Sequence, residues 1–328
     1  MKAFSNANPP DLKSAVALAQ QARQAGRAAS IVGGGSDVLG MMKDRLITPD
    51  TIVNLKAIKG LDQIKTEGGG LRIGGLTTLD AISRHLVIRQ KYTVLAEAAA
   101  DVATPQIRNV ATIAGNVCQR PWCWYYRNGF NCLKNGGSVC YSVTGENQFH
   151  AIFGGGPSYI VHPSDTAPAL VALGASFRIL GPSGERTVPA AEFFTLPTVN
   201  AARENVLKED EVLAEIVVPS LAGGIRSRYH KVMDREAWTH AVVSAAVVLD
   251  LDGGVCRSAR IVLGGVAPIP WRLPEVERML AGQRVTRELA ARAGEAAVAG
   301  ARPLAKNGYK VPLTRAMVRR TLESLALG

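Results

Sequence analysis

The first 56 residues alternate between a helical pattern and short apolar runs. From residue 12 to residue 22, apolar side chains recur at the spacing of one helix face, directly after Pro9-Pro10-Asp11. The runs 29–32 and 51–55 are strand-like, and the first leads into three consecutive glycines, Gly33 to Gly35. This order predicts a small α/β unit over residues 1–56.

Residues 57–220 show the pattern of a second α/β unit. We expect a strand at 71–73, a helix beginning near Thr78, a turn-rich stretch at 104–116 and a helix after Asp165. The stretch 118–150 interrupts this pattern, because it is rich in aromatic residues and glycines and keeps neither a helical nor a strand period. A loop of this length inside a compact domain is usually functional or disordered, and its aromatic content argues against disorder.

A third unit follows a change in pattern near residues 219–224. Strand-like runs lie at 225–232, 240–251 and 255–264, and Gly253-Gly254 supplies a hairpin turn between the last two. Thr314 is expected to cap a final helix over 315–325. The chain thus divides into a domain of residues 1–220, with subdomains 1–56 and 57–220 and the insert 118–150, and a smaller domain of residues 221–328.

Length and composition narrow the protein class. The 328 residues are enough for two domains that each bury a core. Every apolar run is shorter than the ~18 residues that a membrane helix needs, so we expect no membrane span. The segment from Met1 to Asp11 lacks the apolar region of a secretion signal. We therefore expect a cytoplasmic protein, with a periplasmic location open if a partner carries the export signal.

The net charge of +11 raises the question of an acidic ligand. The basic residues are scattered, and no aromatic residues alternate with them, so we expect no nucleic-acid binding. An acidic partner subunit or an anionic cofactor accounts for the charge equally well. The densest basic groups are Arg226, Arg228, Lys231 and Arg235, then Arg315, Arg319 and Arg320.

Four of the five cysteines fall within 23 residues, and the fifth, Cys256, lies in a strand-like run where a buried thiol is expected. The clustered four are Cys118, Cys123, Cys132 and Cys140, separated by four, eight and seven residues. Four thiolates suit either a 4Fe–4S cluster or tetrahedral zinc, although the C-x2-C knuckle typical of zinc ribbons is missing. Structural or redox-active thiols remain a third interpretation. His150 is either a further ligand or a loop histidine bonded to backbone.

Two glycine-containing loops have the composition of phosphate-binding segments. The first runs from Val32 to Asp37, and its three glycines let backbone N–H groups approach an anion closely. The second, from Thr104 to Asn116, offers small and polar side chains as donors. The alternatives are a plain tight turn and a surface loop with satisfied side chains. A third segment, Ser164-Asp165, is expected to cap the helix that follows it.

Together these motifs resemble the FAD-binding medium subunit of the molybdenum hydroxylases, a family that includes xanthine dehydrogenase, aerobic carbon monoxide dehydrogenase and aldehyde oxidoreductases. The two glycine-containing loops resemble the family's two flavin loops, Ser164-Asp165 resembles the segment near the adenine half of FAD, and residues 263–268 resemble a signature of its C-terminal domain. The resemblance implies a set of cofactor-binding residues: Val32, Gly33, Gly34, Gly35, Ser36, Asp37, Thr104, Gln106, Arg108, Asn109, Thr112, Ala114, Gly115, Asn116, Ser164, Asp165 and Lys231.

The resemblance also implies a fold and a function. The fold is α+β, with a two-subdomain FAD-binding domain of the vanillyl-alcohol-oxidase (PCMH) type, followed by a smaller α+β domain of the CO-dehydrogenase-flavoprotein type. The function is electron transfer through FAD in an oxidoreductase complex, between two 2Fe–2S clusters of a small partner subunit and an external acceptor. A large partner carries the molybdenum cofactor, so no catalytic residue is expected here. The alternatives are an autonomous FAD oxidase and a zinc-stabilised binding module without flavin.

The cysteine-rich insert resembles that of the 4-hydroxybenzoyl-CoA reductase β subunit and of the flavin subunit of periplasmic-type aldehyde oxidoreductases. That resemblance implies an additional 4Fe–4S cluster. Cys123, Cys132 and Cys140 occupy positions of matching ligands. We take Cys118 as the fourth ligand, with His150 as the alternative.

Overall fold

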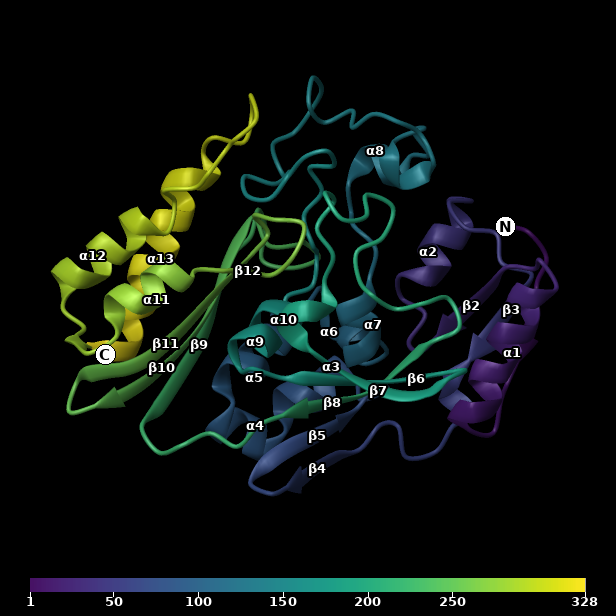
Figure 1. The fold of residues 1–328 in the computed structure, drawn as a ribbon, viewed down its shortest axis with the longest axis horizontal. Coiled ribbons are helices and arrows are strands. Elements are labelled where there is room, and N and C mark those ends of the chain that lie inside the picture. Colours follow the sequence, from purple (N-terminus) through teal and green to yellow (C-terminus); the bar gives the residue numbers. More distant parts are fainter. Residues whose placement is uncertain (328) are drawn as a thin grey trace.

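The computed structural model describes residues 1–327 and shows a mixed α+β protein built on three sheets (Figure 1). The N-terminal sheet is parallel, with strand order β1-β3-β2. Its helix α1 begins after Asp11, whose carboxylate accepts a hydrogen bond from Ser14 N at 2.8 Å, and the predicted apolar face is buried. The elements are β1 (Ser5–Ala7), α1 (Leu12–Gln24), β2 (Ala29–Val32), α2 (Val38–Lys43), β3 (Thr51–Asn54) and the 3₁₀ turn η1 (Leu55–Ala57).

The second unit is an antiparallel sheet of order β4-β5-β8-β6-β7 with helices packed on one side. β5 precedes the cysteine-rich insert in the sequence and β8 follows it, yet the two strands pair. The insert is therefore a connection within one folded unit. The elements are β4 (Ile64–Glu67), β5 (Gly70–Gly74), α3 (Leu79–Arg84), α4 (Leu86–Lys91), α5 (Thr93–Ala100), α6 (Pro105–Arg108), α7 (Ile113–Cys118), α8 (Trp124–Arg127), η2 (Leu133–Asn135), α9 (Thr166–Ala172), β6 (Ser176–Gly181), β7 (Gly184–Pro189), α10 (Ala190–Phe193) and β8 (Val212–Val218).

The C-terminal unit is an antiparallel sheet of order β12-β11-β10-β9, with three helices packed against one face (Figure 1). Along β10, Ala246 and Val248 join the core beneath α5 and α9, while Val247 and Leu249 join the core beneath the C-terminal helices. Both faces are therefore buried, which explains the unbroken apolar run of this strand. The elements are β9 (Ile225–Val232), β10 (Val243–Asp252), β11 (Val255–Gly264), β12 (Trp271–Arg272), α11 (Pro274–Leu280), β13 (Gln283–Arg284), α12 (Arg287–Ala296) and α13 (Lys310–Ala326).

Two expectations about helix starts need correction or refinement. The final helix begins at Lys310 and not after Thr314, because Pro312 falls in the first turn, where a missing N–H costs nothing. The Thr314 hydroxyl instead donates to Lys310 O at 2.8 Å inside the helix. At α9, Ser164 caps the helix by accepting from Ala167 N at 3.0 Å. Asp165 makes no cap bond.

The carboxylate of Asp165 joins the two domains. Lys231 Nζ on β9 lies 2.8 Å from one oxygen, and the Tyr229 hydroxyl donates to the other at 2.6 Å. Lys231 also donates to the backbone oxygens of Asp101 and Thr239 at 2.8 and 3.2 Å. Both charged side chains are almost fully buried, so removing either one leaves the other as a buried charge without a counter-ion.

In residues 1–327, no helix has the length and apolar character needed to cross a membrane.

We predict that Lys231→Met lowers the free energy of unfolding by about 3–5 kcal/mol, because it leaves the Asp165 carboxylate buried without its counter-ion. Adding Asp165→Asn should recover a large part of that loss, since the charge is then removed as well. Urea unfolding of both variants measures this. Lys2→Met is the control: it removes the half-exposed Lys2–Asp50 pair and should cost less than about 1 kcal/mol. Equal losses in the single and double variants would contradict the interpretation.

Candidate functional site

A cavity of about 650 Å³ lies where the two glycine-containing loops meet the C-terminal domain. This volume is in the range of ligand-binding pockets. The first loop contributes Gly34 to Asp37, and the helix after it contributes Lys43. Val102 and Ala103 line the cavity just before the second loop, which contributes Ile107, Val110, Ala111, Gly115 and Asn116. The C-terminal domain adds a segment before β10. The wall residues from that segment are Arg235, Trp238, Thr239 and His240.

The two loops touch backbone to backbone at Gly34. A Cβ on Gly34 would lie 2.1 Å from the carbonyl oxygen of Val110, a distance that no side chain can adopt. Gly35 has φ +77, a conformation that favours glycine. The glycines therefore let the first loop close against the second, and Gly34 and Gly35 present backbone at the cavity beside the side chains of Ser36 and Asp37. Such a cradle fits an anionic pyrophosphate.

The second loop is held by side-chain caps. Thr112 Oγ1 accepts from Gly115 N at 3.3 Å at the start of α7. Asn116 Oδ1 then accepts from the hydroxyls of Ser164 and Thr166, each at 2.6 Å. These buried bonds tie the second loop to the α9 segment and so set the position of Asp165 on the cavity wall.

The residues implied by the resemblance lie in five different places. Gly34, Gly35, Ser36, Asp37, Gly115, Asn116 and Asp165 line the cavity. Others support it from behind: Thr104 caps α6, Arg108 donates to Val102 O at 2.8 Å, Ser164 caps α9, and Lys231 is paired with Asp165. Val32 is buried in the small N-terminal core. Gly33, Thr112 and Ala114 line a separate small cavity, and Gln106 and Asn109 are exposed on the surface.

Sequence reasoning missed the contribution of α2 and of the segment before β10. Lys43 and Arg235 add two cations to the cavity wall, and Trp238, Thr239 and His240 close it from the C-terminal domain. Trp238 N donates to Ala103 O at 3.2 Å, and both residues have positive φ although neither is glycine. The cluster of basic residues around Arg235 was the available signal. Two cations, a glycine cradle and aromatic walls fit the phosphate and planar rings of FAD.

Asp37 connects the first loop to the cysteine-rich insert. One oxygen of its carboxylate accepts from Arg120 N at 3.0 Å, and the other lies 2.7 Å from Arg127 Nη2. A cluster of aromatic rings orders the rest of the insert, with Tyr125 in edge or stacked contact with Phe130 and Tyr141. The Tyr125 hydroxyl accepts from Glu146 N at 2.6 Å. The absence of a helical or strand period is thus compatible with a well-packed segment.

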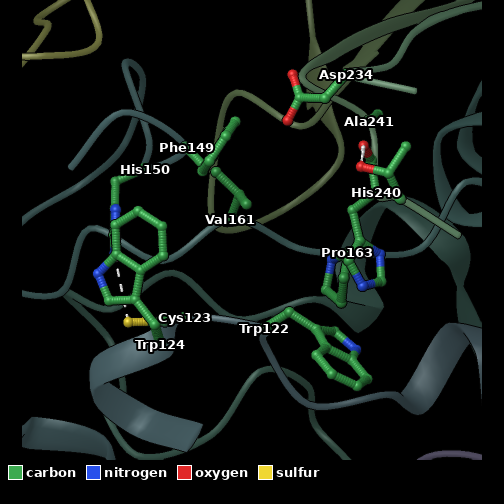
Figure 2. Close-up of a pocket in the computed structure, with 11 residues that line it drawn as sticks. Trp122, Cys123, Trp124, Phe149, His150, Val161, Pro163, Asp234, His240 and Ala241 are labelled. Carbon is green, nitrogen blue, oxygen red and sulfur yellow. Dashed lines mark hydrogen bonds between the residues drawn. The ribbon is translucent and has the colours of Figure 1, made fainter. Parts of the chain in front are cut away.

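Three of the cysteines share one environment within the insert. Burial raises the pKa of Cys123 to about 11, and the neighbouring Cys140 and Cys132 sulfurs add to the rise. His150 Nε2 lies 3.3 Å from Cys123 Sγ, as Figure 2 shows. Burial also lowers the pKa of His150 to about 4, so this imidazole is neutral at physiological pH. Among residues 1–327, no three His, Cys, Asp or Glu side chains stand in an arrangement that could hold a metal ion.

Cys118 is placed elsewhere. It ends α7 and lines the small apolar cavity behind the two loops, together with Ile31, Leu55 and Leu76. Burial alone raises the pKa of its thiol to about 12, with no contribution from another cysteine. Four residues of extended chain separate Cys118 from Cys123, and within them Arg120 is tied to Asp37 and Glu204. The structure therefore places His150, and not Cys118, in contact with Cys123.

Comparison with known proteins agrees with this geometry. Residues 2–221 match the family "FAD binding domain in molybdopterin dehydrogenase", and residues 228–325 match "CO dehydrogenase flavoprotein C-terminal domain". The chain is 34% identical over 302 residues to the aldehyde oxidoreductase FAD-binding subunit PaoB of Escherichia coli, covering 90% of each chain. It is 30% identical over 321 residues to the carbon monoxide dehydrogenase medium chain of Hydrogenophaga pseudoflava, covering 96% of this chain and 94% of the relative.

Solved structures give the same result. A carbon monoxide dehydrogenase structure from Hydrogenophaga pseudoflava superimposes with a TM-score of 0.77 and 29% identity, covering 99% of this chain and 97% of that chain. Reconstituted CO dehydrogenase from Oligotropha carboxidovorans gives a TM-score of 0.77 at 26% identity, covering 99% and 98%. The expected fold class is confirmed. The chain belongs to the family of FAD-binding medium subunits of molybdenum hydroxylase-type dehydrogenases.

Proposed function

We propose that this chain holds FAD in the 650 Å³ cavity and passes electrons between 2Fe–2S clusters of a small partner subunit and an external acceptor. The observation that carries the proposal is the backbone cradle at Gly34 and Gly35, which opens on a cavity with two cationic side chains. Bound FAD supplies redox chemistry in one- or two-electron steps. A large partner subunit carries the molybdenum cofactor and acts on the organic substrate.

The residues of the cavity have distinct tasks in this proposal. Gly34, Gly35 and Ser36 present backbone and hydroxyl donors to the pyrophosphate, and Lys43 and Arg235 balance its charge. Asp165 keeps the C-terminal segment closed over the cavity through Lys231. Support for the partners comes from the relatives, which are described as a medium chain and an FAD-binding subunit.

We further propose that the insert holds a 4Fe–4S cluster through Cys123, Cys132, Cys140 and His150. Three thiols in one electrostatic neighbourhood and a neutral imidazole are a donor set that suits such a cluster. Burial raises the pKa of Cys123 to about 11, so this thiol is protonated in the free chain, and metal binding requires the loss of that proton. His150 replaces Cys118 as the fourth ligand because Cys118 lines the cavity behind the flavin loops.

For the FAD site, we predict that Gly34→Ala abolishes stable flavin binding, because its Cβ must push the first loop away from Val110. The ratio of flavin absorbance to protein in the purified variant measures the loss. Gly300→Ala is the matched control: it has open space around the added methyl group and should retain full flavin. Full flavin occupancy in Gly34→Ala would refute the assignment of the first loop.

For the cluster, we predict that Cys132→Ser removes protein-bound iron and acid-labile sulfide while flavin remains bound. Cys118→Ser should retain iron, sulfide and flavin, because its thiol contacts the apolar core. Iron, sulfide and zinc counted per chain in the two variants show which cysteine holds the metal. Unchanged iron in Cys132→Ser would exclude the cluster, and zinc in place of iron would favour a structural metal site. Iron lost from Cys118→Ser would restore Cys118 as a ligand.

A further inference from the structure

Trp122 stands on the boundary between the cysteine-rich insert and the flavin cavity. Its indole lines the large cavity and also a smaller one of about 150 Å³ next to Cys123 and His150. Trp122 is 46% exposed. Between Pro121 and Phe149, it is the residue of the insert that lines the large cavity. Figure 2 shows it beside His240, whose ring centroid lies 5.3 Å away at an angle of 37°.

Arg127 also packs over this indole. Its guanidinium carbon lies 4.2 Å from the centroid of the Trp122 ring. The guanidinium is itself fixed: it lies 2.7 Å from Asp37 and donates to the backbone oxygens of Arg120 and Pro121, each at 2.9 Å. Only 8% of the Arg127 side chain is exposed. A half-exposed tryptophan would normally sample several rotamers, but here a flat cation with three polar anchors restricts it.

We propose that Trp122 contacts the isoalloxazine ring of bound FAD, and that Arg127 is the positioning residue that holds the indole for this contact. The proposal rests on the FAD site proposed above. A ring that exchanges electrons with the cluster proposed for the insert must lie near the insert. The indole of Trp122 lies on the cavity wall that borders the insert. Holding the indole in place before binding reduces the entropy lost when FAD enters the cavity.

The experiment compares Trp122→Leu with Trp124→Leu in the full chain. An indole in contact with isoalloxazine quenches its fluorescence, so Trp122→Leu should raise the fluorescence yield of bound flavin several-fold and raise the FAD Kd about tenfold. Trp124 belongs to the same insert and lines only the smaller cavity, so its replacement should leave both quantities near the wild-type values. Equal changes in the two variants would mean that the insert is merely loosened, and would overturn the proposal.

Arg127 is tested by Arg127→Lys, which keeps the positive charge near Asp37 but removes the flat face over Trp122. Flavin fluorescence should rise toward the value of Trp122→Leu, whereas Arg120→Lys should not change it, since the Arg120 side chain pairs with Glu204.

Wild-type fluorescence in Trp122→Leu, with or without weaker FAD binding, overturns the isoalloxazine contact. Wild-type fluorescence in Arg127→Lys overturns the positioning role. Absence of FAD uptake by the wild-type chain contradicts the proposed function itself.

Discussion

The buried pair of Asp165 and Lys231 is the interaction on which the cavity depends. Asp165 starts the helix that Asn116 fixes through Ser164 and Thr166, and Lys231 belongs to the first strand of the C-terminal sheet. Their contact therefore joins the second glycine-containing loop to the other domain. Lys231 also binds Thr239 O, which sets the segment that closes the cavity. A buried ion pair is a poor source of stability, but it permits few alternative registers between the domains.

The cysteine-rich insert is ordered by a different set of forces. Small metal-binding domains often fold only when the metal is bound. Here, Arg127 and Arg120 attach the insert to Asp37 and Glu204, and aromatic contacts around Tyr125 fill its interior. The buried Lys134–Glu204 pair, with atoms 2.6 Å apart, adds a further anchor. The cysteines are consequently held in one region by contacts of the protein itself.

Local sequence patterns predicted the elements well and the site in part. The glycine run at 33–35, the helix start after Asp11 and the apolar strand β10 each follow from short-range chemistry. Lys43, Trp238 and His240 were missed because their role comes from tertiary packing of segments about 200 residues apart. Cys118 was chosen as the fourth ligand because it belongs to the four clustered cysteines, and that choice stays a prediction. Spacing cannot reveal that α7 ends at that residue and directs it toward the core.

The ionisable groups around the cavity suit the binding of an anionic cofactor. Asp37 is paired with Arg127, and Asp165 with Lys231. Burial lowers the pKa of His240, so that side chain is neutral at physiological pH. Within residues 1–327, Lys43 and Arg235 are the wall cations for which no carboxylate partner is found, and both suit an anion. With its carboxylates in ion pairs, the wall offers cation and ring contacts that suit an anionic cofactor with planar rings, and the lowered pKa of His240 makes this imidazole a weak base.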